Sequence, residues 1–364
     1  MNAVARLLGV ALLAGLLAVP SPLGACAVAP PRDVVVEIAS ESAIIVWDRE
    51  AKTEHFIRRA TFAPTAPGST PVKDFGFLVP TPSVPALEEV DDRAFAELAK
   101  VTAPRTETRS RPAGGGCALG CGALAPKADA PPAAVEVLAE KHVAGYDAQV
   151  LRAGDADALT AWLKGHDYEV RPALAQWLKP YLEKKWVVTA FKIGNAPAAQ
   201  PNSPVGSAAV RMSFRTDAPF YPYREPADMR DAKAPRLLRV FVIADQKMNG
   251  SLGAGAPWAG QTVWAGAPGA EGWKGALAHL KVPGLRPTDS TWLTEFEDRS
   301  APRKGDDDLT FAAAGDQNPV QRPTRIVYAA RTDGSARPAF ALLGAAVGGL
   351  YLTRFLVGLA SRRG

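Results

Sequence analysis

Cysteine and histidine are scarce in this chain of 364 residues, which contains three cysteines and four histidines. So few cysteines exclude a small scaffold held together by many disulfides. None of the histidines lies in an H-x-x-x-H or H-E-x-x-H pattern, which excludes the common zinc-protease motifs. The G-x-S-x-G elbow, the P-loop and the dinucleotide-binding fingerprint are also missing, so no motif in the chain predicts a catalytic or nucleotide-binding site.

The chain also lacks a strong excess of charge of one sign. Lysine and arginine number 42 against 37 aspartates and glutamates, and three of the basic residues lie in the last eleven positions. This balance predicts no nucleic-acid partner, because proteins that bind nucleic acids carry a concentrated basic patch.

No cofactor is predicted. The densest acidic run, residues 306–308, could hold Ca²⁺ together with Asp298 or Asp316, but its spacing does not match an EF-hand loop, and a solvated loop is the favoured interpretation.

The N-terminus, in contrast, has the features of an export signal. Arg6 is the only charged side chain in the first thirty residues, and an apolar run extends from Leu7 to Val19. A basic start, a short apolar core and small residues at its end define a secretory signal peptide, and about a dozen apolar residues are too few to span a bilayer. We therefore expect residues 1–25 to be a signal peptide that is cleaved after Ala25.

The residues around the expected cleavage site have a second interpretation. Leu23-Gly24-Ala25-Cys26 resembles a bacterial lipobox, in which Cys26 becomes the lipidated first residue of the mature protein. The alternative is an ordinary cleavage followed by an unmodified cysteine. This alternative is favoured, because a second anchor is predicted at the other end of the chain.

That second anchor is the apolar stretch of residues 339–360. As a helix it would be about 33 Å long, which matches a bilayer core of about 30 Å. Arg354 is its one charge and lies close enough to its end to reach the interface. Arg362 and Arg363 follow in the short tail of residues 361–364, and basic flanks stay cytoplasmic. We therefore predict a transmembrane helix with the preceding chain outside the cytoplasm; a buried C-terminal helix is the alternative.

Gly344 and Gly348 form a small-xxx-small pair within this predicted span. Such pairs let two membrane helices approach closely, so a dimer through these glycines is one hypothesis. The alternative is that they are two of the many small residues in an alanine-rich span.

Two of the cysteines, Cys117 and Cys121, lie in the glycine-rich segment of residues 114–122. Because an exported chain meets oxidising conditions, a disulfide between them is predicted, with a bridge from Cys26 to one of them as the alternative. Three intervening residues do not make a thioredoxin-like pair. The segment also offers too few ligands for a metal site.

The chain between the two apolar ends has the pattern of an α+β fold, predominantly antiparallel β with a helical pair. One helix is expected to begin after Asp155, which can cap it, and to end at Gly165. The next helix is expected to begin at Pro172. A further helix is expected over residues 88–101. Short runs of β-branched and aromatic residues predict strands at 33–39, 42–48, 55–62, 75–79, 135–138, 148–151, 186–193, 207–214 and 237–244.

These elements suggest a division of the mature chain. Residues 26–245 are expected to form one extracytoplasmic α+β domain, interrupted by a flexible Gly- and Pro-rich loop at 102–132. Residues 246–338 are expected to be a loop-rich extension and stalk.

Two further features, one polar and one aromatic, are candidate sites. His55 follows Glu54 on an expected strand, where neighbours point to opposite faces, so the two side chains form no dyad. The aromatic cluster at residues 220–224 could line a groove for a sugar or a proline-rich peptide, but packing in the core is the favoured interpretation.

Several stretches occur in an order that resembles the bacterial domain of unknown function 2330 family. The resemblance extends over roughly residues 26–308 and implies an exported protein, often with a C-terminal span. It implies no catalytic residues, because it carries no established activity. Members often begin with a cysteine-rich segment, whereas this chain has only Cys26 there, which leaves the partner of that cysteine open. The stretches are ESAIIVWD (41–48), EHFI (54–57), FGFLVPTP (75–82), AWLK (161–164), WVVTAFK (186–192) and FRTDAPFYP (214–222).

We therefore expect a membrane-tethered extracytoplasmic module, periplasmic or on the cell surface, that binds or scaffolds a protein or glycan of the bacterial envelope. The alternative is a hydrolase-like envelope enzyme whose site is assembled from distant residues. A stalked structural protein is a third hypothesis. A pocket that joins histidine, a carboxylate and serine or cysteine within hydrogen-bond reach would favour the enzyme.

Overall fold

The computed structural model divides the chain into two compact units. The large unit comprises Met1–Pro104 and Ala118–Arg322, and the small unit comprises Arg105–Cys117 and Pro323–Gly364. Within these units the structure describes residues 27–29, 36–64, 76–110, 135–168, 170–193, 205–206, 209–230 and 236–329.

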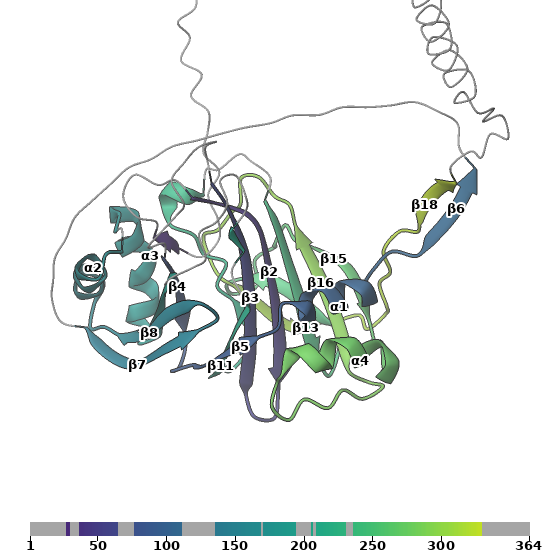
Figure 1. The fold of residues 1–364 in the computed structure, drawn as a ribbon, viewed down its shortest axis with the longest axis horizontal. Coiled ribbons are helices and arrows are strands. Elements are labelled where there is room, and N and C mark those ends of the chain that lie inside the picture. The colour runs from purple at the N-terminus through teal and green to yellow at the C-terminus, as the bar shows by residue number, and fades with distance from the viewer. Residues whose placement is uncertain are drawn as a thin grey trace, which may run out of the picture. The chain divides into compact units, whose positions relative to one another are not determined.

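An eight-stranded sheet is the centre of the large unit (Figure 1). Seven strands follow the order β15-β16-β13-β2-β3-β11-β5, and β10 also pairs with β3. Every pairing in this sheet is antiparallel except the one between β13 and β2. The strands are β2 (Val36–Asp48), β3 (Thr53–Pro64), β5 (Ala86–Val90), β10 (Val205–Gly206), β11 (Ala209–Arg215), β13 (Leu237–Ala244), β15 (Gln261–Gly266) and β16 (Trp292–Asp298).

Strand β2 differs from its prediction, because it replaces the two strands expected at 33–39 and 42–48. The chain does not turn at Ser40 and Glu41; the ladder with β3 continues past them, with a register shift between Ile38 and Ser40. Glu41 stays in the sheet because its side chain is buried and forms an ion pair with Arg58 at 2.7 Å. Glu41, which resembles part of a turn in the sequence, is therefore one half of a buried ion pair in the fold.

The helix expected over residues 88–101 begins later than predicted. Ala86–Val90 forms strand β5 on the edge of the sheet, and helix α1 covers Arg93–Val101. Glu88 belongs to the strand because it pairs with Arg211 on the neighbouring β11.

A five-stranded antiparallel sheet lies beside the first, in the order β1-β4-β9-β8-β7. The predicted helical pair is confirmed as α2 (Ala156–Gly165) and α3 (Pro172–Glu183), whose Leu and Trp side chains pack with Leu78 and Val188 of this sheet. Asp155 caps α2 as expected, accepting a hydrogen bond from the Ala158 amide at 2.7 Å. The strands are β1 (Ala27–Ala29), β4 (Gly76–Thr81), β7 (Glu136–Val143), β8 (Tyr146–Arg152) and β9 (Val187–Ile193).

The strand expected at residues 75–79 continues past its predicted end. Strand β4 includes Pro80, which lies opposite Val188 of β9. The other neighbour, β1, pairs only with residues 76–78. In the described ranges the β1 side of β4 is therefore open at Pro80, which is an edge setting where proline is tolerated.

The two sheets enclose the main core, which a small third sheet of β12, β17 and β14 completes. The opposite face of the eight-stranded sheet is covered by α1 and by α4 (Gly269–Leu280), which lie side by side (Figure 1). The short elements are β12 (Phe220–Tyr221), the 3₁₀ helix η1 (Ala227–Met229), β14 (Met248–Leu252) and β17 (Leu309–Ala313).

The loop-rich extension expected from residue 246 instead contains regular structure. Strand β16 lies next to β13 within the sheet, so residue 245 does not mark an edge of the domain. The sequence of β16, WLTEFED, does not resemble that of a buried strand, because it contains Glu295 and Glu297, which are nevertheless buried in the fold. Arg239 and Arg322 bond these carboxylates at 2.7–3.0 Å, which compensates their burial.

The described part of the small unit is a parallel pair, β6 (Thr106–Ser110) with β18 (Arg325–Ala329). Strand β6 falls in the predicted flexible loop and β18 in the predicted stalk. No helix in the ranges given above is long and apolar enough to cross a bilayer. The predicted signal peptide, the predicted span at 339–360 and the tail at 361–364 lie outside those ranges.

Candidate binding groove

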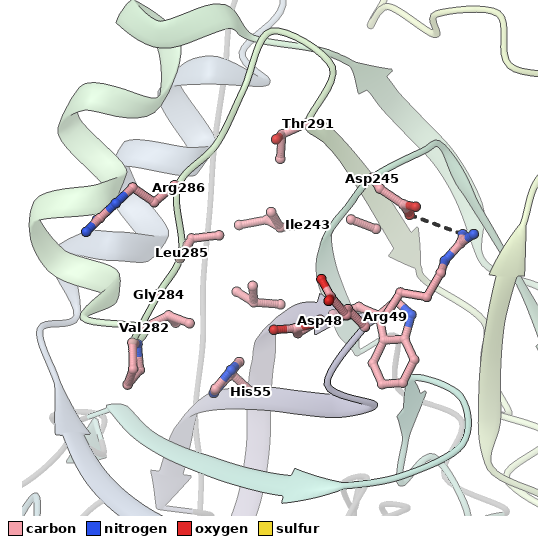
Figure 2. A pocket seen from close by; sticks show the side chains of 15 residues that line it. Asp48, Arg49, His55, Ile243, Asp245, Val282, Gly284, Leu285, Arg286 and Thr291 are labelled. Carbon is pink, nitrogen blue, oxygen red and sulfur yellow. Dashed lines mark ion pairs between the residues drawn. The ribbon is translucent and has the colours of Figure 1, made fainter.

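A groove with a volume of about 620 Å³ opens at one end of the eight-stranded sheet (Figure 2). Its walls are the ends of β2 and β13, the turn between β2 and β3, and the loop that follows α4. We call it the strand-end groove and define it by its lining residues, 46–50, His55, 243–245, 282–286 and Thr291.

The parallel pairing of β2 and β13 explains why two aspartates meet there. Val46 lies opposite Ile243, so both strands reach their carboxyl ends at the same edge of the sheet. Asp48 ends β2 and Asp245 follows β13. Carboxyl ends of adjacent parallel strands are a common place for ligand sites, because loops diverge there and leave a crevice.

The groove combines an apolar floor with a charged rim. Val46 and Ile243 are buried in the floor, and Val282 and Leu285 are half-buried in the opposing wall. Trp47 points to the other side of the sheet, where it packs in the main core. Apolar walls with a few polar groups are typical of ligand-binding clefts.

Only some of the rim charges are paired. Arg49 forms an exposed ion pair with Asp245 at 3.1 Å, drawn as a dashed line in Figure 2. Asp48 accepts a hydrogen bond from the Ala51 amide at 2.8 Å, which holds the turn. Among the described residues, Glu50 and Arg286 have no ionic partner. Figure 2 shows the Arg286 side chain extending away from Asp48 and Asp245.

His55 is the titratable group at the edge of the floor. Its Nδ1 lies 2.8 Å from Ser213 Oγ on β11. Burial and the neighbouring Arg211 guanidinium lower the pKa of His55, and the Asp48 and Glu88 carboxylates only partly oppose them. The imidazole is therefore neutral at pH 7, and the groove presents it as a hydrogen-bonding group.

A second hollow, of about 560 Å³, lies between the β7–β8 hairpin and the end of α2. Its charged side chains already have partners. His142 pairs with Asp147 at 2.9 Å and Lys192 with Asp167 at 3.4 Å, and His166 stacks on Trp162 with centroids 3.7 Å apart. Fewer of its groups are left for a ligand than in the strand-end groove.

The aromatic cluster at residues 220–224 packs in the core, as the favoured interpretation held. Phe220, Tyr221 and Tyr223 are buried. Trp177 Nε1 donates a hydrogen bond to the Arg224 carbonyl at 2.8 Å. No open aromatic groove exists at this position.

The acidic run at 306–308 is not a solvated loop throughout. Asp308 is buried and accepts a hydrogen bond from Tyr181 OH at 2.8 Å, and Asp307 pairs with Arg224 at 2.6 Å. These carboxylates stabilise the loop. Across the described ranges, no three His, Cys, Asp or Glu side chains group closely enough to hold a metal ion.

The residues predicted for lipidation, disulfide formation, dimer contact and membrane topology lie outside the described ranges. They are the proposed lipidation site Cys26, the proposed disulfide pair Cys117 and Cys121, the glycines Gly344 and Gly348, and the basic residues Arg354, Arg362 and Arg363.

Sequence reasoning missed the strand-end groove, although one signal was present. The strand runs SAIIVWD and LLRVFVIAD both end in aspartate. Their parallel pairing, which brings Asp48 and Asp245 together, is a property of the fold and could not be read from either run.

The family comparison agrees with the resemblance noted in the sequence. The family described as "Uncharacterized protein conserved in bacteria (DUF2330)" matches residues 20–359. No curated protein matches the chain. Because the match covers nearly the whole sequence, the chain belongs to the bacterial domain of unknown function 2330 family.

Proposed function

We propose that this protein is an exported, membrane-tethered binding module of the bacterial envelope, and that the strand-end groove is its ligand-binding site. The observation that carries the proposal is the groove itself, which combines the half-buried apolar side chains of Val282 and Leu285 with the exposed carboxylates of Asp48 and Glu50. An apolar cleft with a few polar groups at its rim suits recognition of a ligand that is partly apolar.

Support for the tether comes from the sequence alone. A leader-like N-terminus and an apolar stretch at 339–360 with basic residues after it give the same orientation. Deleting residues 339–364 is expected to move the protein from the membrane fraction to the soluble exported fraction. Retention of the deletion variant on the membrane would contradict the C-terminal tether and point to lipidation of Cys26 or an uncleaved leader.

The binding site is tested with a variant that fills the groove. Pro283 is exposed and lines the groove, whereas Pro287 lies in the same loop but does not line it. Envelope proteins cross-linked to the full-length wild type should be lost with Pro283→Trp and retained with Pro287→Trp. Equal recovery with both variants would place binding elsewhere.

A hydrolase is the second candidate, favoured by the 2.8 Å contact between His55 Nδ1 and Ser213 Oγ. Ser213 is half-buried and does not line the groove, and no described hydrogen bond joins Asp48 to His55. The His55–Ser213 contact therefore lacks both access from the groove and a carboxylate bonded to His55, and a binding site explains the groove better than a hydrolase site does. A fluorophosphonate probe that labels the wild type but not Ser213→Ala would reverse this ranking.

A further inference from the structure

The charges of the strand-end groove restrict the class of its ligand, and this step rests on the proposed function. At neutral pH the lining carries the carboxylates of Asp48, Glu50 and Asp245, the guanidinium groups of Arg49 and Arg286, and a neutral His55. Arg49 is engaged by Asp245 at 3.1 Å. Figure 2 shows Arg286 extending away from Asp48 and Asp245, so Asp48 has no cation beside it from that residue. Glu50 lines the groove without an ionic partner among the described residues.

These anions lie above an apolar floor, so a complementary ligand carries a positive charge on an apolar stem. Lysine and arginine side chains have this form, because their methylene groups pack along apolar surfaces while the charged head stays in water. Complementary rim charges also select a partner and speed its encounter. An acidic ligand would be repelled by the two carboxylates, and a neutral ligand would gain nothing from them.

A glycan fits the groove less well than a peptide does. Sugar rings stack on exposed aromatic faces, and the aromatic side chains that line this groove are Trp47 and the imidazole of His55. Trp47 is 9 % exposed and packs in the main core, and His55 is buried to the same degree. The groove therefore offers no open ring on which a sugar could stack.

We propose that the strand-end groove binds a basic peptide segment of another envelope protein, with aliphatic side chains against the half-buried Val282 and Leu285 and a lysine or arginine head group at Asp48 and Glu50. The His55 imidazole lies beside this path and supplies a hydrogen bond to the peptide.

The test uses three labelled peptides of equal length with terminal charges blocked. Each alternates leucine with a second residue, which is lysine, glutamine or glutamate. Fluorescence anisotropy with the full-length protein in detergent micelles measures each affinity. We expect the lysine peptide to bind roughly tenfold more tightly than the glutamine peptide, the advantage to fall as ionic strength rises, and the glutamate peptide not to bind.

The double variant Asp48→Asn/Glu50→Gln is expected to remove the lysine advantage. Its control is Glu183→Gln, because Glu183 is an exposed carboxylate that does not line the groove. Melting curves of all variants check that they are folded. Persistence of the lysine advantage in the double variant would overturn the proposal.

The remaining outcomes separate this inference from the proposed function. If lysine and glutamine peptides bind equally and Pro283→Trp abolishes both, the groove binds a ligand but the basic-peptide inference is wrong. If the lysine peptide binds and Pro283→Trp leaves that binding unchanged, the site lies elsewhere and both proposals are wrong. If none of the three peptides binds, the basic-peptide inference is wrong, whereas the cross-linking result still decides the proposed function.

Discussion

The carboxyl group of Glu54 accepts a hydrogen bond from the Phe220 amide at 2.9 Å in a position with no exposure to solvent. Its other oxygen, Oε1, has no hydrogen-bond partner among the described residues. Burial raises the pKa of Glu54 well above its usual value of 4.5, and the single amide bond only partly opposes this. Glu54 is therefore a proton-binding group of the folded state.

This burial predicts a pH dependence of stability. Because the folded-state pKa is raised, the stabilising protonated form is fully present below about pH 4.5, and its contribution is lost as the pH rises through the folded-state pKa. Glu54→Gln removes the titration, so it should be more stable than the wild type at about pH 8, with the difference shrinking toward about pH 4. Urea unfolding at a series of pH values measures this. If the difference in unfolding free energy between the two proteins stays constant across this pH range, the prediction is wrong.

Asp298 is expected to be among the most sensitive polar positions of the large unit. It is buried and accepts hydrogen bonds from Tyr223 OH and Ser300 Oγ, both at 2.6 Å, and from Trp258 Nε1 at 3.1 Å. Burial alone would raise the pKa of Asp298, but the hydrogen bonds from Ser300 and Tyr223 outweigh it and the pKa is lowered. The buried Arg303 guanidinium, 3.8 Å away, depends on this charge.

Removing that charge leaves Arg303 partly unpaired, so Asp298→Asn should lower the free energy of unfolding by about 3–5 kcal/mol. Tyr223→Phe removes one donor and keeps the charge, so its loss should be about 1–3 kcal/mol. Chemical denaturation at neutral pH compares the two. A smaller loss for the Asp298 variant than for the Tyr223 variant would show that the charge is not the important feature.

Gly76 is required by a close approach at the start of β4. A Cβ atom there would lie 2.5 Å from Tyr168 Cε1 and 2.8 Å from the Phe191 carbonyl oxygen. Gly76→Ala should therefore destabilise the protein by about 1–3 kcal/mol through overpacking. Gly154 is the matched control, because nothing lies within 4 Å of a Cβ placed on it. Similar melting temperatures for the two alanine variants would disprove the steric argument.

The N-terminal cap of α2 makes a smaller and more local prediction. Asp155 accepts a hydrogen bond from the Ala158 amide, so Asp155→Ala should reduce stability by about 1 kcal/mol. Asp157, in the first turn, makes no such cap, and its alanine variant should lose only the weaker helix-dipole effect. The comparison requires denaturation curves for both variants, and equal losses would argue against the cap as the main contribution.

Helices and hydrophobic strands were predictable because their signals are local. Helix α2 begins after Asp155 and ends at Gly165, and α3 begins at Pro172. Within each helix the spacing of the apolar residues predicts which face is buried. Strands such as β9 and β13 were found from their β-branched runs. Local patterns of this kind need no knowledge of the partner element.

Strands whose buried charged side chains pair with residues far along the chain were not predictable. The polar Ser40 and Glu41 made one strand resemble two, although Arg58 pairs with Glu41 in the fold, and the carboxylates of Glu295 and Glu297 concealed β16. The groove has the same difficulty, since β2, β13 and the loop at 282–291 meet only in the fold. A sequence pattern cannot show a partner that lies far along the chain.

The pairing of β6 with β18 has a consequence for the order in which the chain assembles. Thr106 and Arg325 are register partners although most of the large unit lies between them in sequence. Closing so long a loop is entropically unfavourable until the intervening chain has folded. The pair should therefore form last and open first, and its amide hydrogens should exchange with solvent well before those of β2 and β3.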